Sequence, residues 1–334
     1  MENRRWVLAR RPEGAASVED FRFERGPVPN PGDGELLLKT RFLSLDPYMR
    51  GRMNAARSYA PPVEIGAPML GGTVAEVVES RAPGFAAGDL VLSFNGWQDY
   101  ALAPAAAVSK LGSELKTPSH ALGVMGMPGF TAWHGLLKIG EPKPGETVVV
   151  AAATGAVGSV VGQIARLKGC RAVGIAGGDD KCRHAVEEVG FDACVDHRDP
   201  EFRQKLKAAC PEGIDIYFEN VGGKVLDAVL PRLNDGARIP LCGVISAYNA
   251  AGDDGALDAS RLLRTLLVRR VRVQGFIISD HQDEAPEFRR QMQAWLDAGE
   301  VRYTEHRVEG LERAPQAFLD LMKGDHLGKV VLSL

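Results

Sequence analysis

Cysteine is scarce in this chain of 334 residues, and the first half of the chain contains none. The cysteines are Cys170, Cys182, Cys194, Cys210 and Cys242. An odd number without a Cys-x-x-Cys pair disfavours both a disulfide framework and a thiolate zinc site. We therefore expect buried structural thiols, several of them in or beside strands, and no bound metal.

Long apolar runs and an excess of one charge are also missing. No window reaches the length of a membrane span, and the arginines near the N-terminus are not followed by an apolar signal segment. A formal net charge of -3 leaves no basic stripe for nucleic acid or for an anionic membrane. We expect a cytoplasmic protein whose partner is a small molecule, with no nucleic acid and no membrane.

Two regions of the chain differ in their pattern of predicted secondary structure, and the length of the chain favours two domains. Residues 1–120 contain short β-type runs between Gly/Pro turns such as 30–34 and 87–89, which is typical of an antiparallel, partly closed barrel. Residues 121–298 alternate between helix and strand, which predicts a doubly wound parallel sheet of six strands, the Rossmann arrangement. Residues 299–334 again have α+β character and are expected to return to the first domain.

The boundaries expected in the second domain follow the apolar periodicity. Strands are expected from 148 to the turn at 154, and over 172–176, 193–195, 214–218, 237–242 and 271–278. Helices are expected over 122–137, 157–167, 180–189, 200–209, 223–233, 259–268 and 285–298.

A glycine-rich turn joins the first of these strands to the first following helix. The turn reads Thr154-Gly155-Ala156-Val157-Gly158, with Ala153 in the first glycine position of the dinucleotide fingerprint. Gly155 would let a pyrophosphate approach the backbone, and Gly158 would let the helix pack tightly on the strand. The free N–H groups and positive dipole end of the helix favour an anion. A purely structural β-turn-α unit is the alternative.

The end of the next strand bears on the choice between NAD and NADP. Its small residues, which include Gly177, leave room for a 2′-phosphate, and Lys181 in the following helix can reach that phosphate. Asp179 and Asp180 count against this interpretation, although an Asp at that point also caps a helix. The pattern predicts NADPH.

Four further segments occur together in one family. They are 45–53 (LDPYMRGRM), 152–159 (AATGAVGS), 219–223 (ENVGG) and 242–249 (CGVISAYN). From Leu36 to Val331 the chain resembles the zinc-independent medium-chain dehydrogenase/reductases, within them the prostaglandin reductases (leukotriene B4 dehydrogenases) and plant alkenal double-bond reductases. The resemblance implies a GroES-like barrel plus a Rossmann domain, a homodimer, NADPH, and reduction of the C=C bond of α,β-unsaturated ketones or aldehydes.

The resemblance also implies roles for residues at matching positions. The stretch 155–158 would hold the pyrophosphate, Lys181 the 2′-phosphate, and Asn220 the ribose on the nicotinamide side. The residues expected to line the nicotinamide are Cys242, Gly243, Ile245, Ser246, Tyr248, Phe276, Ile277 and Ile278. The chain departs from the family at His197, where Tyr is usual, and at His326, where Asn is usual. Both family residues contact the cofactor. His197 can still stack on adenine or donate to the phosphate.

The expected chemistry needs no metal. Zinc members of the superfamily use a Cys in the first domain and a Gly-His-Glu motif, whereas here residues 70–73 read Leu-Gly-Gly-Thr. Reducing an enone needs a positioned hydride, which goes to the β-carbon, and donors that stabilise the enolate before solvent protonates its α-carbon. Tyr248 is the candidate donor, directly or through the ribose 2′-OH, and the alternative is that it only anchors ribose. Tyr48 is expected to line the substrate pocket, with a core tyrosine as the alternative.

Other interpretations remain open from the sequence. An NADPH:quinone reductase shares the fold and lacks zinc, and a non-catalytic NADPH-binding sensor is possible from another class. His134, beside Trp133 on an apolar helix, is expected to be a buried histidine with its hydrogen bonds satisfied.

Overall fold

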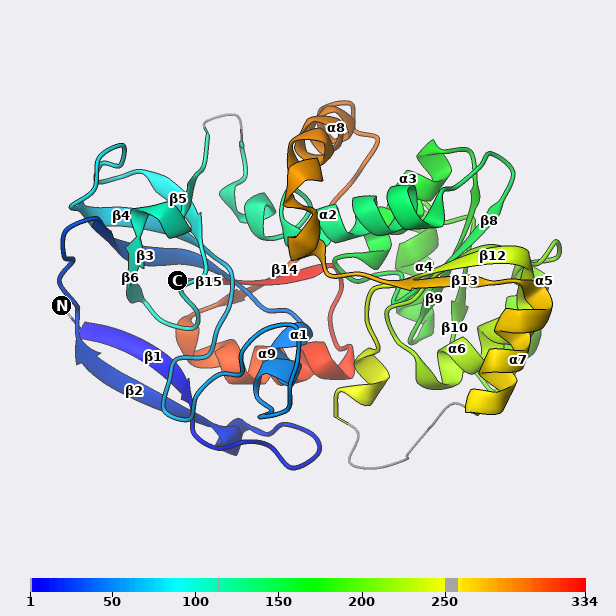
Figure 1. Ribbon diagram of the computed structural model, residues 1–334, viewed down its shortest axis with the longest axis horizontal. Coiled ribbons are helices and arrows are strands. Elements are labelled where there is room, and N and C mark those ends of the chain that lie inside the picture. Colours follow the sequence, from blue (N-terminus) through cyan, green and yellow to red (C-terminus); the bar gives the residue numbers. More distant parts are fainter. Residues whose placement is uncertain (1, 113–114, 250–257) are drawn as a thin grey trace. The chain divides into compact units, whose positions relative to one another are not determined.

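The computed structural model describes residues 2–112, 115–249 and 258–334. The chain forms two compact units (Figure 1). The N-terminal unit comprises Met1–Gly126 and Glu305–Leu334, and the central unit comprises Met127–Thr304. Within the described residues, no helix is long and apolar enough to cross a membrane.

The N-terminal unit is built on an antiparallel sheet, as the alternation of short β-type runs and turns predicts. Its strands are β1 (Glu2–Leu8), β2 (Phe21–Pro27), β3 (Glu35–Ser44), β4 (Thr73–Ser80), β5 (Leu90–Ser93), β6 (Tyr100–Pro104), β7 (Ser109–Lys110), β14 (Glu305–Glu309) and β15 (Lys329–Ser333). The main sheet has the order β14-β15-β3-β4-β5-β7, with β6 also paired to β3, while β1 and β2 form a separate hairpin. β14 lies parallel to β15, and β15 lies antiparallel to β3.

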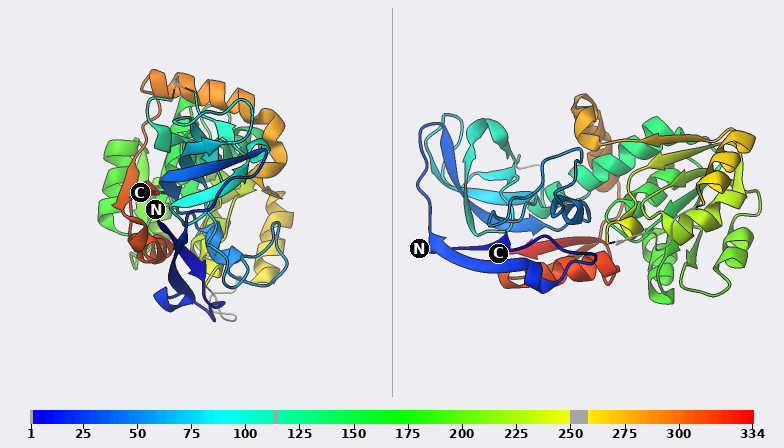
Figure 2. Two further views of the ribbon diagram at one scale, coloured as in Figure 1. Left: turned by 90° about the vertical axis from the view of Figure 1, so that its left-hand side faces the viewer. Right: turned by 60° about the horizontal axis from the view of Figure 1, so that its bottom comes forward.

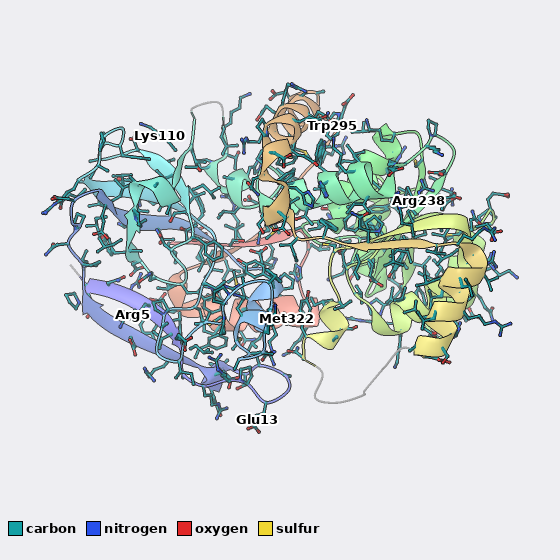
Figure 3. All side chains as sticks on the ribbon, viewed as in Figure 1. Arg5, Glu13, Lys110, Arg238, Trp295 and Met322 are labelled. Atoms are coloured by element: carbon teal, nitrogen blue, oxygen red, sulfur yellow. The ribbon has the colours of Figure 1, made fainter. Side chains whose placement is uncertain are left out.

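Aromatic side chains from distant parts of the sequence form the core of this unit. The helices here are α1 (Tyr48–Arg52) and α9 (Ala314–Lys323). Phe318 of α9 contacts Trp97 edge-on, with ring centroids 5.7 Å apart, and Trp97 stacks on Phe21 at 5.4 Å. Figure 2 shows the C-terminal segment beside the first strands, and Figure 3 shows Met322 at the end of α9. The C-terminal residues therefore complete the core of the N-terminal unit.

The central unit contains a parallel sheet. Its strands are β8 (Thr147–Ala151), β9 (Arg171–Ala176), β10 (Ala193–Asp196), β11 (Ile214–Phe218), β12 (Leu233–Leu241) and β13 (Arg272–Gly275). Among the described residues the order is β10-β9-β8-β11-β12-β13, which is the Rossmann order and confirms the predicted six-stranded sheet. The strand order reverses between β8 and β11, and ligands of such sheets bind beyond the carboxyl ends of the strands at this point.

Most predicted helices of the central unit are present. They are α2 (Met127–His134), α3 (Gly158–Leu167), α4 (Asp179–His184), α5 (Phe202–Ala209), α6 (Gly223–Val229), α7 (Ala259–Arg269) and α8 (Ala285–Asp297). The helix expected over 122–137 is wrong at its start: a short 3-10 helix ends at Leu122, and α2 begins only at Met127. Pro128 lacks an N–H and is tolerated only in the first turn of a helix, so α2 cannot extend further back.

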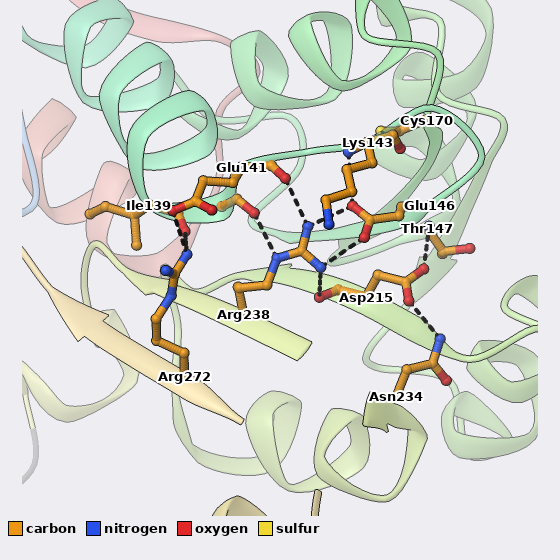
Figure 4. A network of polar contacts seen from close by, with 11 residues as sticks. Ile139, Glu141, Lys143, Glu146, Thr147, Cys170, Asp215, Asn234, Arg238 and Arg272 are labelled. Carbon is orange, nitrogen blue, oxygen red and sulfur yellow. Dashed lines mark hydrogen bonds and ion pairs between the residues drawn. The ribbon is translucent and has the colours of Figure 1, made fainter. Parts of the chain in front are cut away.

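A polar network holds the amino ends of the strands together (Figure 4). Arg238 of β12 donates to Glu146 Oε1 at 2.9 Å, just before β8, and to the carbonyl of Gly140 at 2.8 Å. Asp215 of β11 accepts from the N–H of Thr147 at 2.8 Å and from Asn234 Nδ2 at 2.8 Å. Because these groups already form hydrogen bonds with one another, they are not free to bind a ligand at the amino ends of the strands.

Candidate cofactor site

The turn after β8 places the start of α3 against the sheet. Ala152 has φ +52°, in the left-handed region that costs a residue with a Cβ roughly 1–2 kcal/mol. The strained residue therefore precedes Ala153, which the fingerprint aligns with the first glycine. At Gly158 a Cβ would lie 2.3 Å from the carbonyl oxygen of Ala152, so only glycine fits there. Gly158 has the packing role that the spacing predicts.

The turn places several backbone N–H groups at the start of α3. The Gly155 N–H closes the turn onto the Ala152 carbonyl at 3.0 Å. The next amides, those of Ala156, Val157 and Gly158, lie at the beginning of a ten-residue helix. Amides in that position, at the positive end of the helix dipole, suit a pyrophosphate.

Two basic side chains lie over Gly177, at the end of β9. A Cβ at Gly177 would be 2.9 Å from His197 Nε2 and 3.0 Å from Arg198 Nε, so glycine makes room for both side chains. Asp196 orients this corner, because its Oδ1 accepts from the N–H groups of Gly178 and Arg198, both at 2.8 Å. Lys181 lies in the adjoining helix α4.

Arg198 is a residue that sequence reasoning missed. Its signal was present, since it directly follows His197 at the end of a strand. The structure brings His197, Arg198 and Gly177 together, and their chemistry suits a phosphate on the ribose 2′ position.

A second group of predicted residues converges at the carboxyl ends of β11 and β12. Asn220 Nδ2 donates to the carbonyl of Ala151 at 2.8 Å. The main-chain carbonyl of Asn220 accepts from the N–H of Ile245 at 3.2 Å. A Cβ at Gly243 would lie 3.2 Å from the Tyr248 hydroxyl oxygen, so the tyrosine crosses directly over this glycine. The loops after three neighbouring strands thus meet at the point where the strand order reverses.

A buried glutamate holds these loops, and sequence reasoning did not single it out. Glu219 is fully buried, and its Oε1 accepts from the N–H groups of Val221 at 2.6 Å and Gly222 at 2.8 Å and from the Tyr217 hydroxyl at 3.0 Å. Its carbonyl accepts from the N–H groups of Cys242 and Gly243. Burial raises the pKa of Glu219. A charged residue directly after a buried strand was the available signal.

The loop after β13 packs on α2. A Cβ at Gly135 would lie 2.8 Å from the Phe276 ring, so this glycine admits the aromatic side chain. Ile277 and Ile278 follow Phe276 and are half-buried. The His134 ring lies 5.5 Å from that of Phe276, which places the histidine beside a residue expected to line the nicotinamide.

The prediction for His134 is only partly right. The residue is buried, and its Nδ1 is 2.9 Å from Glu284 Oε2, but its Nε2 has no hydrogen-bond partner among the described residues. The His281 ring lies beside it, with centroids 3.8 Å apart and ring planes inclined by 30°. Potential ligand atoms of His134, His281 and Glu284 lie within 4.8 Å of one another, which the sequence did not predict.

The N-terminal unit holds Tyr48 and His326. Tyr48 opens α1, and burial raises the pKa of its hydroxyl well above the usual value. His326 lies in the segment before β15, where a hollow is lined by residues that include Arg307, Asp325 and Val330. Tyr48 is half-buried and packs against the hydrophobic core of this unit.

A buried ion pair joins the Tyr48 motif to the C-terminal segment. Lys329 Nζ lies 3.1 Å from Asp46 Oδ1 and donates to the carbonyls of Leu45 at 2.6 Å and Val330 at 3.0 Å. Lys329 is 1% exposed, and burial lowers its pKa while Asp46 opposes the change. The Ser44 hydroxyl also donates to Asp46. This pair fixes the chain just before α1.

Comparison with known proteins defines the class. Residues 4–111 match the family described as "N-terminal domain of oxidoreductase", and residues 156–294 match the one described as "Zinc-binding dehydrogenase". The chain belongs to the medium-chain dehydrogenase/reductases, in their zinc-independent group.

Three relatives make the comparison more specific. The chain is 56% identical over 332 residues to the NADPH-dependent curcumin reductase of Escherichia coli, with 99% of this chain and 96% of the relative covered. It is 39% identical to prostaglandin reductase 1 of Rattus norvegicus, with 98% of each covered. The structure of CurA in complex with NADPH from Vibrio vulnificus matches with a TM-score of 0.96 and 54% identity, covering 99% of this chain and 98% of that one.

Proposed function

We propose that this protein uses NADPH to reduce the C=C bond of α,β-unsaturated ketones and aldehydes, without zinc. The observation that carries the proposal is the crossing of Tyr248 over Gly243, which puts a neutral hydroxyl donor among the loops expected to line the nicotinamide. The relatives named as curcumin and prostaglandin reductases support the same reaction class.

The residues present fit a phosphorylated dinucleotide. Gly177 makes room for the side chains of His197 and Arg198, both of which can donate hydrogen bonds to a phosphate. We assign the pyrophosphate to the amides of 156–158 and the 2′-phosphate to Lys181, His197 and Arg198. Asn220 and the loop 242–248 then hold the nicotinamide end.

The reaction requires the protein to hold the substrate beside the cofactor and to donate a hydrogen bond to the substrate oxygen. When bound, NADPH supplies the hydride that goes to the β-carbon of the substrate. Tyr248 stabilises the enolate oxygen by donating a hydrogen bond from its hydroxyl, directly or through the ribose 2′-OH. Glu219 connects two of these loops, because its side chain accepts from the N–H groups of Val221 and Gly222 after β11 and its main-chain carbonyl accepts from those of Cys242 and Gly243 after β12.

Substituting Tyr248 tests this role. Tyr248→Phe should lower kcat about tenfold, because one hydrogen bond to developing charge is worth roughly 1.5 kcal/mol. If Tyr248 only anchors ribose, KM for NADPH rises while kcat is kept. Steady-state kinetics with both substrates separates the two results. Unchanged kcat and unchanged KM would contradict both roles.

The reaction class is tested by NADPH consumption with a panel of 2-alkenals, enones and quinones, with NADH as the cofactor control. We expect turnover of the enals and enones, and preference for NADPH. Turnover of quinones alone would identify a quinone reductase. Tight NADPH binding without turnover of any of these compounds would identify a non-catalytic binding protein.

We also propose that the protein is a homodimer that associates through β13 and α7. β13 is at one edge of the parallel sheet, and Leu263 and Leu267 of α7 are 65% and 79% exposed. Val268 and Val273 are also exposed large apolar residues. An open edge strand beside apolar side chains favours pairing with a second copy, in which the same surface is used twice.

The dimer is tested by adding a charge to this surface. Leu267→Glu should convert a dimer to a monomer in light scattering coupled to size-exclusion chromatography, because the glutamate would have to be buried. Val18→Glu, at an exposed apolar residue of the N-terminal unit, is the matched control and should leave the mass unchanged. A monomeric parent protein would contradict the proposal.

A further inference from the structure

Two of the cysteines lie in contact, which the sequence did not predict. Cys182 on α4 and Cys194 on β10 have their sulfur atoms 3.2 Å apart, with the Cys194 thiol donating to the Cys182 sulfur. All five cysteines are free thiols. Cys182, Cys194 and Cys242 are only half-buried, so the expectation of buried structural thiols is confirmed for Cys170 and Cys210 and wrong for the other three. Both residues of the pair are therefore partly exposed.

The environment makes these thiols unlike the others. The hydrogen bond from Cys194 lowers the pKa of Cys182, and the same hydrogen bond, with burial, raises the pKa of Cys194. Burial raises the pKa of Cys170 and of Cys210 to about 11, and that of Cys242 to about 12. Because the thiolate is the reactive form, Cys182 is the cysteine that an oxidant should attack first.

The pair also connects the two elements that carry the proposed 2′-phosphate site, helix α4 and strand β10. Cys182 directly follows Lys181 in α4, and Cys194 is on the strand that ends at Asp196, before His197 and Arg198. Among the described residues, the hydrogen bond from the Gly178 N–H to Asp196 Oδ1, at 2.8 Å, also connects the start of α4 to the end of β10. A covalent bond between the sulfurs would join α4 to β10 a few residues away from the phosphate-binding groups.

We propose that Cys182 and Cys194 are a redox modification site, at which a hydroperoxide forms a reversible disulfide that weakens binding of the 2′-phosphate. The inference rests on the proposed phosphate site. In the first step the Cys182 thiolate attacks the peroxide O–O bond, giving a sulfenic acid and, after protonation, an alcohol or water. In the second, the Cys194 sulfur displaces the hydroxyl as water and forms the S–S bond. The two sulfurs are oxidised by two electrons in total, and the peroxide is reduced; a dithiol reverses the change.

The expected effect on the cofactor follows from geometry. A disulfide requires sulfurs about 2.0 Å apart, so the two must approach by roughly 1 Å. Since Cys182 adjoins Lys181, drawing α4 toward β10 displaces the Lys181 ammonium. Loss of one hydrogen bond to a charged phosphate should weaken NADPH binding about tenfold, while NADH binding is unchanged.

The disulfide is tested on the purified full-length protein by adding hydrogen peroxide and mapping peptides without reduction. We expect a Cys182–Cys194 cross-link, with Cys170, Cys210 and Cys242 still open to alkylation after denaturation. In Cys194→Ser, dimedone should trap a sulfenic acid on Cys182, and Cys182→Ser should give neither product. Free thiols at both positions after peroxide treatment, or cross-links to other cysteines, would overturn the proposal.

The effect on the cofactor is tested by titrating NADPH and NADH against the nicotinamide fluorescence, which requires no substrate. Oxidation should raise the Kd for NADPH alone, dithiothreitol should restore it, and Cys182→Ser should not respond to peroxide. A disulfide that leaves both Kd values unchanged would overturn the regulatory part of the proposal. If Arg198→Ala also leaves the NADPH Kd unchanged, the proposed phosphate site is what fails, and the peptide map still decides the disulfide.

Discussion

Lys329→Met is expected to lower the free energy of unfolding by about 3–5 kcal/mol, because it leaves Asp46 buried without a cation. The lysine is 1% exposed and lies 3.1 Å from that carboxylate. It also supplies the N–H groups bonded to the carbonyls of Leu45 and Val330, so the substitution removes three contacts together. Denaturant unfolding of the purified variant measures the change.

A matched surface pair provides the control for this prediction. Arg25 and Glu2 are 2.9 Å apart, close to the 3.1 Å of the buried pair, but they are 60% and 51% exposed. Arg25→Met should therefore cost less than about 1 kcal/mol. Combining Lys329→Met with Asp46→Leu should recover much of the lost stability, because no charge then remains buried. Equal, small effects at both pairs would show that the buried pair does not hold the segment before α1.

The double variant Lys181→Ala, Arg198→Ala is expected to raise the KM for NADPH about 100-fold and to leave the KM for NADH unchanged. Each cation that contacts a phosphate contributes roughly 1.5–3 kcal/mol, and tenfold in affinity corresponds to about 1.4 kcal/mol. The substitutions remove positive charge near Gly177 while leaving the backbone that holds the pyrophosphate intact. Steady-state kinetics with each cofactor measures the ratio.

The single variants refine this prediction. Arg198→Ala should account for part of the loss, because its guanidinium lies against Gly177. Lys205→Ala, on α5 and paired with Asp199, is the matched control and should leave the cofactor preference unchanged. A parallel rise in KM for NADPH and NADH in the double variant would indicate a general disruption of the fold rather than loss of a phosphate contact.

The fold could be predicted to the level of its sheets. Buried β-branched runs such as Thr147–Ala151 specify parallel strands because both faces of the sheet are covered. The start of α2 could not be placed by periodicity, since the apolar pattern continues through 122–126 while Pro128 confines the helix to residues after Gly126.

Some residues of the candidate site could likewise be predicted from the sequence, and others could not. The glycine turn depends on local spacing, so Gly155 and Gly158 could be identified from the sequence. Glu219 and Arg198 each follow a strand closely, which is a local signal, but their contacts and the Cys182–Cys194 contact depend on how neighbouring strands align. Asp46 and Lys329 are separated by most of the chain, and only the return of the C-terminal segment brings them together.

The central claim is hydride transfer from NADPH to a carbon of the C=C bond. It is tested most directly by reducing an enone with NADPH that carries deuterium at the transferable position of the nicotinamide, followed by NMR of the product. We expect the saturated ketone with one deuterium on the β-carbon and an α-proton from solvent. An allylic alcohol with deuterium on the carbinol carbon would contradict it.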